Sequence, residues 1–160
     1  MMHLTAVVSK ILLPAYALLP AKLHTPEADV MLLTIGLQES RFIYRHQIGG
    51  PAHSFWQGEQ GGGMVAGVRT HAATKDMAAK VYAARNVPAT NEAIYEAIEH
   101  DDVLAAALAR LLLYSDPKPL PKIGDIDGAW GLYLRTWRPG KPKPDSWPAH
   151  YANARATLGV

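Results

Sequence analysis

The stretch TPEADVMLLTIGLQESRF, residues 25–42, decides the fold. Thr25 can cap a helix, Pro26 suits a first helical turn, and Glu27 favours the positive end of a helix dipole. The run that follows, residues 28–37, is apolar on nearly every side, and a helix of that kind lies in the centre of a protein. The stretch therefore predicts a buried central helix that ends in a polar cluster.

Glu39 lies at the C-terminal end of this predicted helix. Burial and the negative end of the helix dipole both disfavour a carboxylate, so we expect the pKa of Glu39 to be raised. A carboxylic acid that stays protonated near neutral pH is what a general acid in glycoside cleavage requires. Arg41 and Arg45 would oppose this shift if they pointed at Glu39. The alternative interpretation is a helix-end glutamate that faces solvent or pairs with arginine.

The segment after this helix is rich in glycine. Residues 47–67 hold seven of the 13 glycines in the chain, which predicts a loop or a small hairpin with unusual backbone angles. Any β structure is expected within residues 54–68. Gln57 in this segment can bind sugar hydroxyls or an N-acetyl group. Glu59 is either a second carboxylate of the same site or a solvated loop residue.

Two aromatic residues, Phe55 and Trp56, lie inside the glycine-rich segment. Trp56 could stack on a sugar ring and line a cleft. The alternative is that one or both rings anchor the loop to the core.

Residues 4–23 are the most apolar stretch of the chain, interrupted by Lys10 and by prolines at 14 and 20. The charge and the prolines favour a buried helix with a proline kink over an export or membrane-contacting element. Capping residues and apolar spacing predict further helices over residues 74–86, 90–100, 101–114 and 128–137. The Pro- and Lys-rich segment 139–150 is expected to be extended and to pack on the surface through Trp147.

Composition excludes several kinds of chemistry. The chain has 160 residues, a formal net charge of +2 and no cysteine, and 49% of it is hydrophobic. Length and apolar fraction fit a single domain over residues 1–160. Without cysteine there are no disulfides, thiolate metal sites, iron–sulfur clusters or cysteine nucleophiles. The seven histidines show no metal-ligand spacing, so no metal site is expected, and scattered basic residues argue against a nucleic acid partner.

The motif Glu39-Ser40-Arg41-Phe42 resembles the Glu-Ser-x-Phe motif of soluble lytic transglycosylases and goose-type lysozymes. That family then has a segment of the form G-x-x-G-x-x-Q, and residues 50–57 resemble it, ending in Gln57. The sequence departs from the family at Ser54 or Phe55, where a glycine is usual. The whole chain also resembles a set of small tailed-phage proteins, through residues 25–28, 36–42, 111–121 and 137–140.

The resemblance implies a mainly α, lysozyme-like domain with a small β or loop insert that forms one wall of a cleft. It implies a muralytic enzyme of the endolysin kind, with no cofactor, that cuts the glycan strands of peptidoglycan between N-acetylmuramic acid and N-acetylglucosamine. Glu39 would be the catalytic acid and base. Substrate contacts are expected from Ser40, Gln57, Trp56, Glu59 and Tyr114, the last as one of three candidates, with Tyr82 and Tyr95, for the tyrosine of a later family signature. Both a transglycosylase and a hydrolase outcome stay open.

The alternative function is a non-enzymatic phage structural or accessory protein that keeps a lysozyme-like core. Trp130, Trp137, Trp147 and the Pro- and Lys-rich segment would then form a binding surface. An enzyme needs Glu39 at the floor of a groove with Gln57 facing it, whereas a Glu39 locked to arginine without a groove favours the alternative. The phage interpretation places synthesis in the host cytoplasm and action in the periplasm, at the cell wall or in the virion. Oligomeric state has no signature in the sequence.

Overall fold

The computed structural model describes residues 1–160 and is mainly α, as predicted. The elements run in the order α1 (Leu4–Val7), η1 (Val8–Leu12), α2 (Leu13–Tyr16), η2 (Ala21–Leu23), α3 (Pro26–Ser40), η3 (Gly63–Gly67), α4 (Val68–Thr70), α5 (Lys75–Ala84), α6 (Asn91–His100), α7 (Asp102–Ser115), α8 (Ile126–Trp137), η4 (Pro144–Ser146) and α9 (Trp147–Leu158).

Helix α3 is the buried helix that the sequence predicts. Thr25 caps it, because its Oγ1 accepts a hydrogen bond from the backbone N–H of Ala28 at 3.2 Å. Almost every side chain from Ala28 to Leu37 is buried. The helix ends at Ser40, because Arg41 takes up the left-handed conformation with φ 54°.

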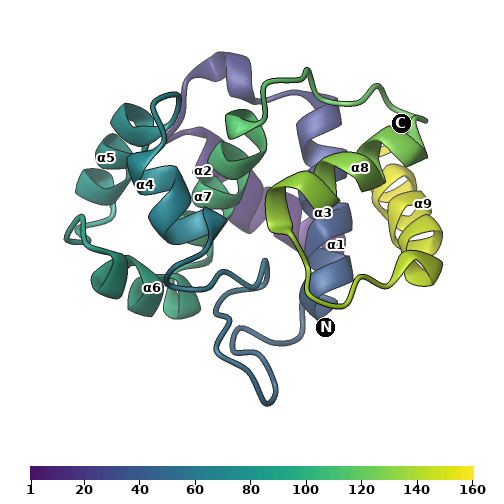
Figure 1. The fold of residues 1–160 in the computed structure, drawn as a ribbon. Coiled ribbons are helices and arrows are strands. Elements are labelled where there is room, and N and C mark those ends of the chain that lie inside the picture. The colour runs from purple at the N-terminus through teal and green to yellow at the C-terminus, as the bar shows by residue number, and fades with distance from the viewer.

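The other helices surround α3 and α7. Helix α9 packs along α3, and α7 contacts α3, α5, α6 and α8. Figure 1 shows α4, α5 and α6 on one side of the molecule and α8 and α9 on the other, with α3 and α7 between them. The buried hydrophobic residues form one cluster of 41, so helices from all parts of the chain share the same core. The core therefore holds the end of α3 in a fixed place.

The N-terminal segment contributes to this core. Helices α1 and α2 are joined through η1, a π-helical turn, and the side chains of Val7, Ile11 and Leu12 are buried, as the prediction of a core helix requires. No helix of the structure has both the length and the apolar character needed to cross a membrane.

Two segments differ from their predictions. Within the segment 139–150 that was expected to be extended, residues 144–146 form η4 and residues 147–150 begin helix α9, and Trp147 is buried rather than packed on the surface. Pro148 is compatible with this helix because it stands in the first turn, where a proline removes no hydrogen bond. Residues 63–70 are helical, so the β structure expected up to residue 68 is wrong there. The glycine-rich segment contains only two isolated bridges, His46 with His53 and His53 with Gly58.

Candidate active site

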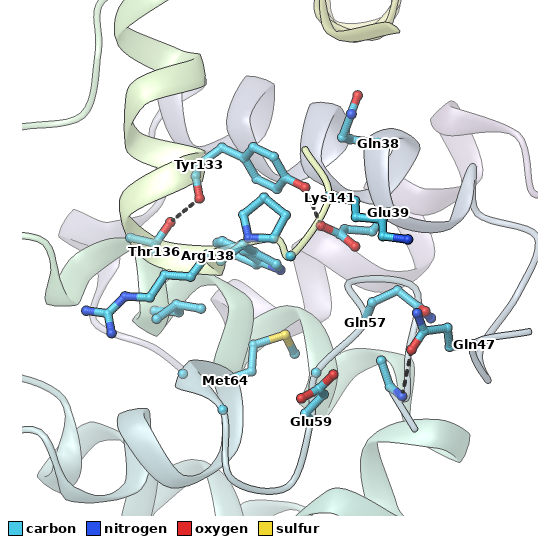
Figure 2. Close-up of a pocket in the computed structure, with 18 of the residues that line it drawn as sticks. Gln38, Glu39, Gln47, Gln57, Glu59, Met64, Tyr133, Thr136, Arg138 and Lys141 are labelled. Atoms are coloured by element: carbon cyan, nitrogen blue, oxygen red, sulfur yellow. Dashed lines mark hydrogen bonds between the residues drawn. The ribbon is translucent and has the colours of Figure 1, made fainter. Parts of the chain in front are cut away.

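A cavity of about 670 Å³ lies at the C-terminal end of α3. Four parts of the chain line it: Gln38 and Glu39 of α3, the glycine-rich loop with its flanks over residues 44–64, Leu112 of α7, and residues 133–143 from the end of α8 onward. Figure 2 shows Glu39 beside Tyr133, with Gln57 and Glu59 on the loop side of the cavity. The structure thus brings three predicted site residues, Glu39, Gln57 and Glu59, to one cavity.

Glu39 is half-buried and forms no ion pair. Burial raises its pKa, while a hydrogen bond from Tyr133 and the charge of Lys143 lower it in part. Arg45 is held elsewhere, because its guanidinium forms two hydrogen bonds to Asp102 at 2.8 Å. Burial therefore dominates, and the carboxyl group of Glu39 keeps its proton to a higher pH than an ordinary glutamate.

Tyr133 is the main partner of Glu39. Its hydroxyl donates a hydrogen bond to Oε1 of Glu39 at 2.5 Å. The ring of Tyr133 is buried and stacks on Trp147, with 5.1 Å between the ring centroids. Burial and the charge of Glu39 raise the pKa of Tyr133, so the hydroxyl stays a neutral donor. The aromatic packing therefore fixes the donor at the carboxyl group.

The residues after Glu39 turn the chain sharply and join it to the glycine-rich loop. Arg41 and Phe42 both have positive φ, at 54° and 53°. The buried hydroxyl of Ser40 donates to the carbonyl of Phe55 at 2.7 Å and accepts from the N–H of Phe42 at 3.1 Å. Ser40 is buried and does not line the cavity, so the prediction that it contacts substrate is wrong. The hydrogen bonds of its hydroxyl stabilise this turn instead.

The ring of Phe42 folds back onto α3 at Gly36. A Cβ at Gly36 would lie 2.1 Å from the ring of Phe42, so only glycine lets the two surfaces meet this closely. Phe42 also packs edge-on against Phe55 and Trp56. The chain is thereby fixed on both sides of Glu39.

Gln57 lines the cavity, and its side-chain amide donates to the carbonyl of Ser54 at 2.7 Å. Ser54 itself has φ 74°, a conformation that favours glycine, and it lies three residues before Gln57. Trp56 does not line the cavity, so that prediction is wrong. Its indole is fully buried and donates to the carbonyl of Leu32 at 2.9 Å, and the alternative that it anchors the loop is confirmed.

The tyrosines suggested by sequence lie outside the cavity. Tyr114, at the end of α7, has the ammonium group of Lys22 over its ring at 5.7 Å and does not line the cavity. Tyr82 and Tyr95 also lie elsewhere. A sequence signal for Tyr133 did exist, because Trp130, Tyr133 and Trp137 follow each other at spacings of three and four within a predicted helix and share one face.

The Pro- and Lys-rich segment forms a wall of the cavity that sequence reasoning missed. Pro139, Gly140, Lys141 and Lys143 line it. The side-chain amide of Gln38 donates to the carbonyl of Lys143 and accepts from the hydroxyl of Ser146, both at 3.0 Å. The end of α3 therefore holds this wall directly, across 105 residues of sequence.

Aromatic side chains also line the cavity. Trp137 is half-buried and donates from its indole to the carbonyl of Trp56 at 2.8 Å, and Tyr44 is exposed on the loop side. These two rings, rather than Trp56, offer flat surfaces to a ligand.

Comparisons with protein-family models, with curated proteins and with solved structures found no match.

The cavity has the groups needed for acid catalysis on a polar ligand. Glu39 can give a proton, Gln57 can orient hydroxyl or amide groups, and Glu59 offers a second, exposed carboxyl group. No histidine lines the cavity. The side chains best arranged to hold a metal ion lie outside it, where His46 and His53 approach Glu99.

Proposed function

We propose that this chain is a peptidoglycan-cleaving enzyme with a lysozyme-like fold and Glu39 as its general acid. The proposal rests on the position of Glu39 and on the protonation of its carboxyl group. Its carboxyl group lies at the end of a buried helix, in a cavity, with a raised pKa and without an arginine partner. These are the conditions under which a carboxylic acid can protonate a glycosidic oxygen.

The geometry around the two motifs supports the family resemblance. Ser54 has the backbone conformation of a glycine at the position three residues before Gln57, where the family pattern has glycine. The glycine-rich loop lines the cavity opposite α8, as an insert that forms a cleft wall would. The positive φ of Ser54 is therefore the backbone conformation that a glycine at this position would favour.

The proposed reaction begins when Glu39 protonates the oxygen between N-acetylmuramic acid and N-acetylglucosamine, and the bond from that oxygen to C1 breaks. The resulting carboxylate is stabilised by the hydroxyl of Tyr133. In a transglycosylase the C6 hydroxyl of the same sugar then attacks C1 and returns its proton to Glu39, which gives a 1,6-anhydro product. In a hydrolase a water molecule, positioned by Glu59, attacks instead.

The same geometry supports an enzyme over a non-enzymatic accessory protein. The accessory protein was expected to show Glu39 locked to Arg41 or Arg45 and no groove. Arg45 instead pairs with Asp102, and Glu39 and Gln57 line one cavity. The proposed substrate places the site of action at the cell wall, reached from the host cytoplasm or in the virion.

The test is a turbidity assay on purified peptidoglycan with wild type and Glu39→Gln. We expect wild type to clear the suspension and the variant to be slower by about 10²–10⁴-fold, the usual contribution of a general acid. Glu96→Gln is the matched control, since it removes an exposed carboxyl group outside the cavity, and Glu59→Gln tests the second carboxyl group of the cavity. Mass spectrometry of the products separates 1,6-anhydro ends from reducing ends.

Full activity of Glu39→Gln, with a fold unchanged by circular dichroism, would remove Glu39 from the mechanism. A wild-type protein that clears no peptidoglycan would support the accessory protein. If Glu59→Gln changes reducing-end products to anhydro products, Glu59 positions water.

A further inference from the structure

A second group of side chains lies outside the cavity, where the glycine-rich loop meets α6. His46 and His53 come from the glycine-rich loop, and Glu99 comes from the last turn of α6. One ligand atom of each lies within 4.8 Å of the ligand atoms of the other two. Sequence spacing gave no sign of this group, because 46 residues separate His53 from Glu99 and the histidines are not in a helical motif.

His53 is oriented as metal-binding histidines are. It is buried, and its Nδ1 lies 2.8 Å from the carbonyl oxygen of Tyr95. Because a carbonyl can only accept, Nδ1 carries the proton and Nε2 keeps a free lone pair. The ring also stacks on Tyr95 at 3.8 Å between centroids, so its direction is fixed.

His46 and Glu99 complete the group. Nδ1 of His46 donates to Oε1 of Glu99 at 2.7 Å. The ring centroids of His46 and His53 lie 4.9 Å apart, and an isolated β-bridge joins the backbones of the two residues. The backbone therefore holds both histidines next to each other, facing one carboxylate.

We propose that His46, His53 and Glu99 bind a divalent transition-metal ion of the zinc class. Two imidazoles and a carboxylate are a ligand set that zinc accepts, with a fourth position left for water. Ligand atoms around tetrahedral zinc lie about 3.3 Å apart, since each bond is about 2.0–2.1 Å long. To reach that spacing, the more exposed side chains of His46 and Glu99 would turn toward Nε2 of His53, whose ring is fixed. The ion takes the place of the proton that His46 shares with Glu99.

The ion would tie the cavity wall to α6. Gln47, Ile48 and Ala52 lie between the two histidines in sequence and line the cavity. A metal bridge from this loop to Glu99 restricts the loop through two residues, His46 and His53, that do not themselves line the cavity. The site is therefore structural in its effect and does not depend on the proposed catalysis.

The experiment titrates Zn²⁺ into chelator-stripped full-length protein at pH 7.5 by calorimetry, with the thermal unfolding midpoint as a second readout. We expect one ion per chain and a higher midpoint, because the ion binds only the folded arrangement. Mg²⁺ is expected to give neither signal, since it prefers oxygen ligands. Enzymatic activity plays no part in either readout.

The variants His46→Ala and Glu99→Gln test the ligands, because these side chains are 57% and 22% exposed and can be changed without opening the core. Each is expected to weaken Zn²⁺ binding by at least about tenfold. Mutation of residues that only hydrogen-bond to the metal ligands already lowers metal affinity by that factor. His24→Ala is the matched control. Nε2 of His24 lies 3.4 Å from Oδ2 of Asp29, but this pair is not part of a group of three possible metal ligands. No binding by wild type, unchanged binding by both ligand variants, or an equal loss in His24→Ala would overturn the proposal.

Discussion

At the scale of single residues, the protonation of Glu39 is set by opposing influences. Burial holds the proton on, while the hydroxyl of Tyr133 and the charge of Lys143 stabilise the carboxylate. Burial prevails, so the pKa lies above its ordinary value of 4.5. Two variants separate these influences.

Glu39→Gln is expected to make the protein more stable than wild type at neutral pH. As pH rises above 4.5, Glu39 ionises in the unfolded chain before it ionises in the folded one, so wild type loses stability through that window. Glutamine does not titrate, so the advantage of the variant grows from pH 3.5 to pH 7. Urea unfolding at both pH values measures it. Glu59→Gln makes the same change in net charge at an exposed position and separates burial from charge; a variant less stable than wild type at pH 7 would contradict the prediction.

Tyr133→Phe is expected to raise the pKa of Glu39 further, because the hydroxyl that stabilises its carboxylate is gone. If Glu39 acts as an acid, the alkaline limb of the kcat/KM profile moves to higher pH. Tyr44→Phe is a suitable control, since Tyr44 lines the same cavity without a hydrogen bond to Glu39. An alkaline limb that stays in place or moves to lower pH would show that the hydroxyl of Tyr133 does not lower the pKa of Glu39.

At the scale of elements, the helices with strong local signals were predictable. The cap and apolar run of α3, and the periodic faces of α6 and α7, gave bounds close to those observed. The η3 turn was missed, because its glycines suggested a loop. Gly63 in fact allows close packing: a Cβ there would lie 2.9 Å from Leu112 of α7. Whether a glycine serves a turn or a close contact depends on what it touches, which local sequence does not show.

Gly36→Ala is expected to destabilise the protein by about 1–3 kcal/mol, the usual effect of overpacking a core. The added methyl group would overlap the ring of Phe42, which is closed in by Phe55 and Trp56. Urea unfolding measures the change.

Gly67→Ala in η3 is the matched control. The nearest atom to its Cβ is the carbonyl oxygen of Gly62 at 3.7 Å, an ordinary contact, and its backbone is already helical, so helix propensity should stabilise this variant by about 0.5–1 kcal/mol. Equal changes in the free energy of unfolding for the two alanine variants would show that a methyl group at residue 36 does not clash with Phe42.

At the scale of the whole molecule, the cavity joins segments that are distant in sequence. Glu39, Gln57 and Glu59 were predictable because they lie within or beside short motifs. The aromatic face of α8 marks Tyr133 as a candidate, but its hydrogen bond to Glu39 and the wall at residues 139–143 were not predictable, because these contacts with α3 cross about a hundred residues. Helix α9 escaped prediction for a related reason: Trp147 looked like a surface anchor, whereas its ring is buried behind Tyr133.

Trp147→Ala is expected to cost about 3–5 kcal/mol, as large-to-small changes of buried aromatic residues do. It also removes the ring on which Tyr133 stacks, so the hydrogen bond to Glu39 loses its support. Thermal unfolding and the peptidoglycan assay measure the two effects. Trp147→Phe keeps an aromatic ring and should retain most of the stability and most of the activity on peptidoglycan. Full activity of a folded Trp147→Ala protein would show that α9 does not position the site.

The hydrogen bond between Tyr133 and Glu39 spans 94 residues, and this has a consequence during translation. A nascent chain that has reached α7 already carries the acid, but neither its tyrosine nor the second wall of the cavity exists yet. The shielded carboxyl group and the binding groove come into being together, once the ribosome has released the residues beyond α8. A chain that ends before α8 therefore lacks both the hydrogen bond that holds the carboxyl group of Glu39 and the cavity wall formed by residues 133–143.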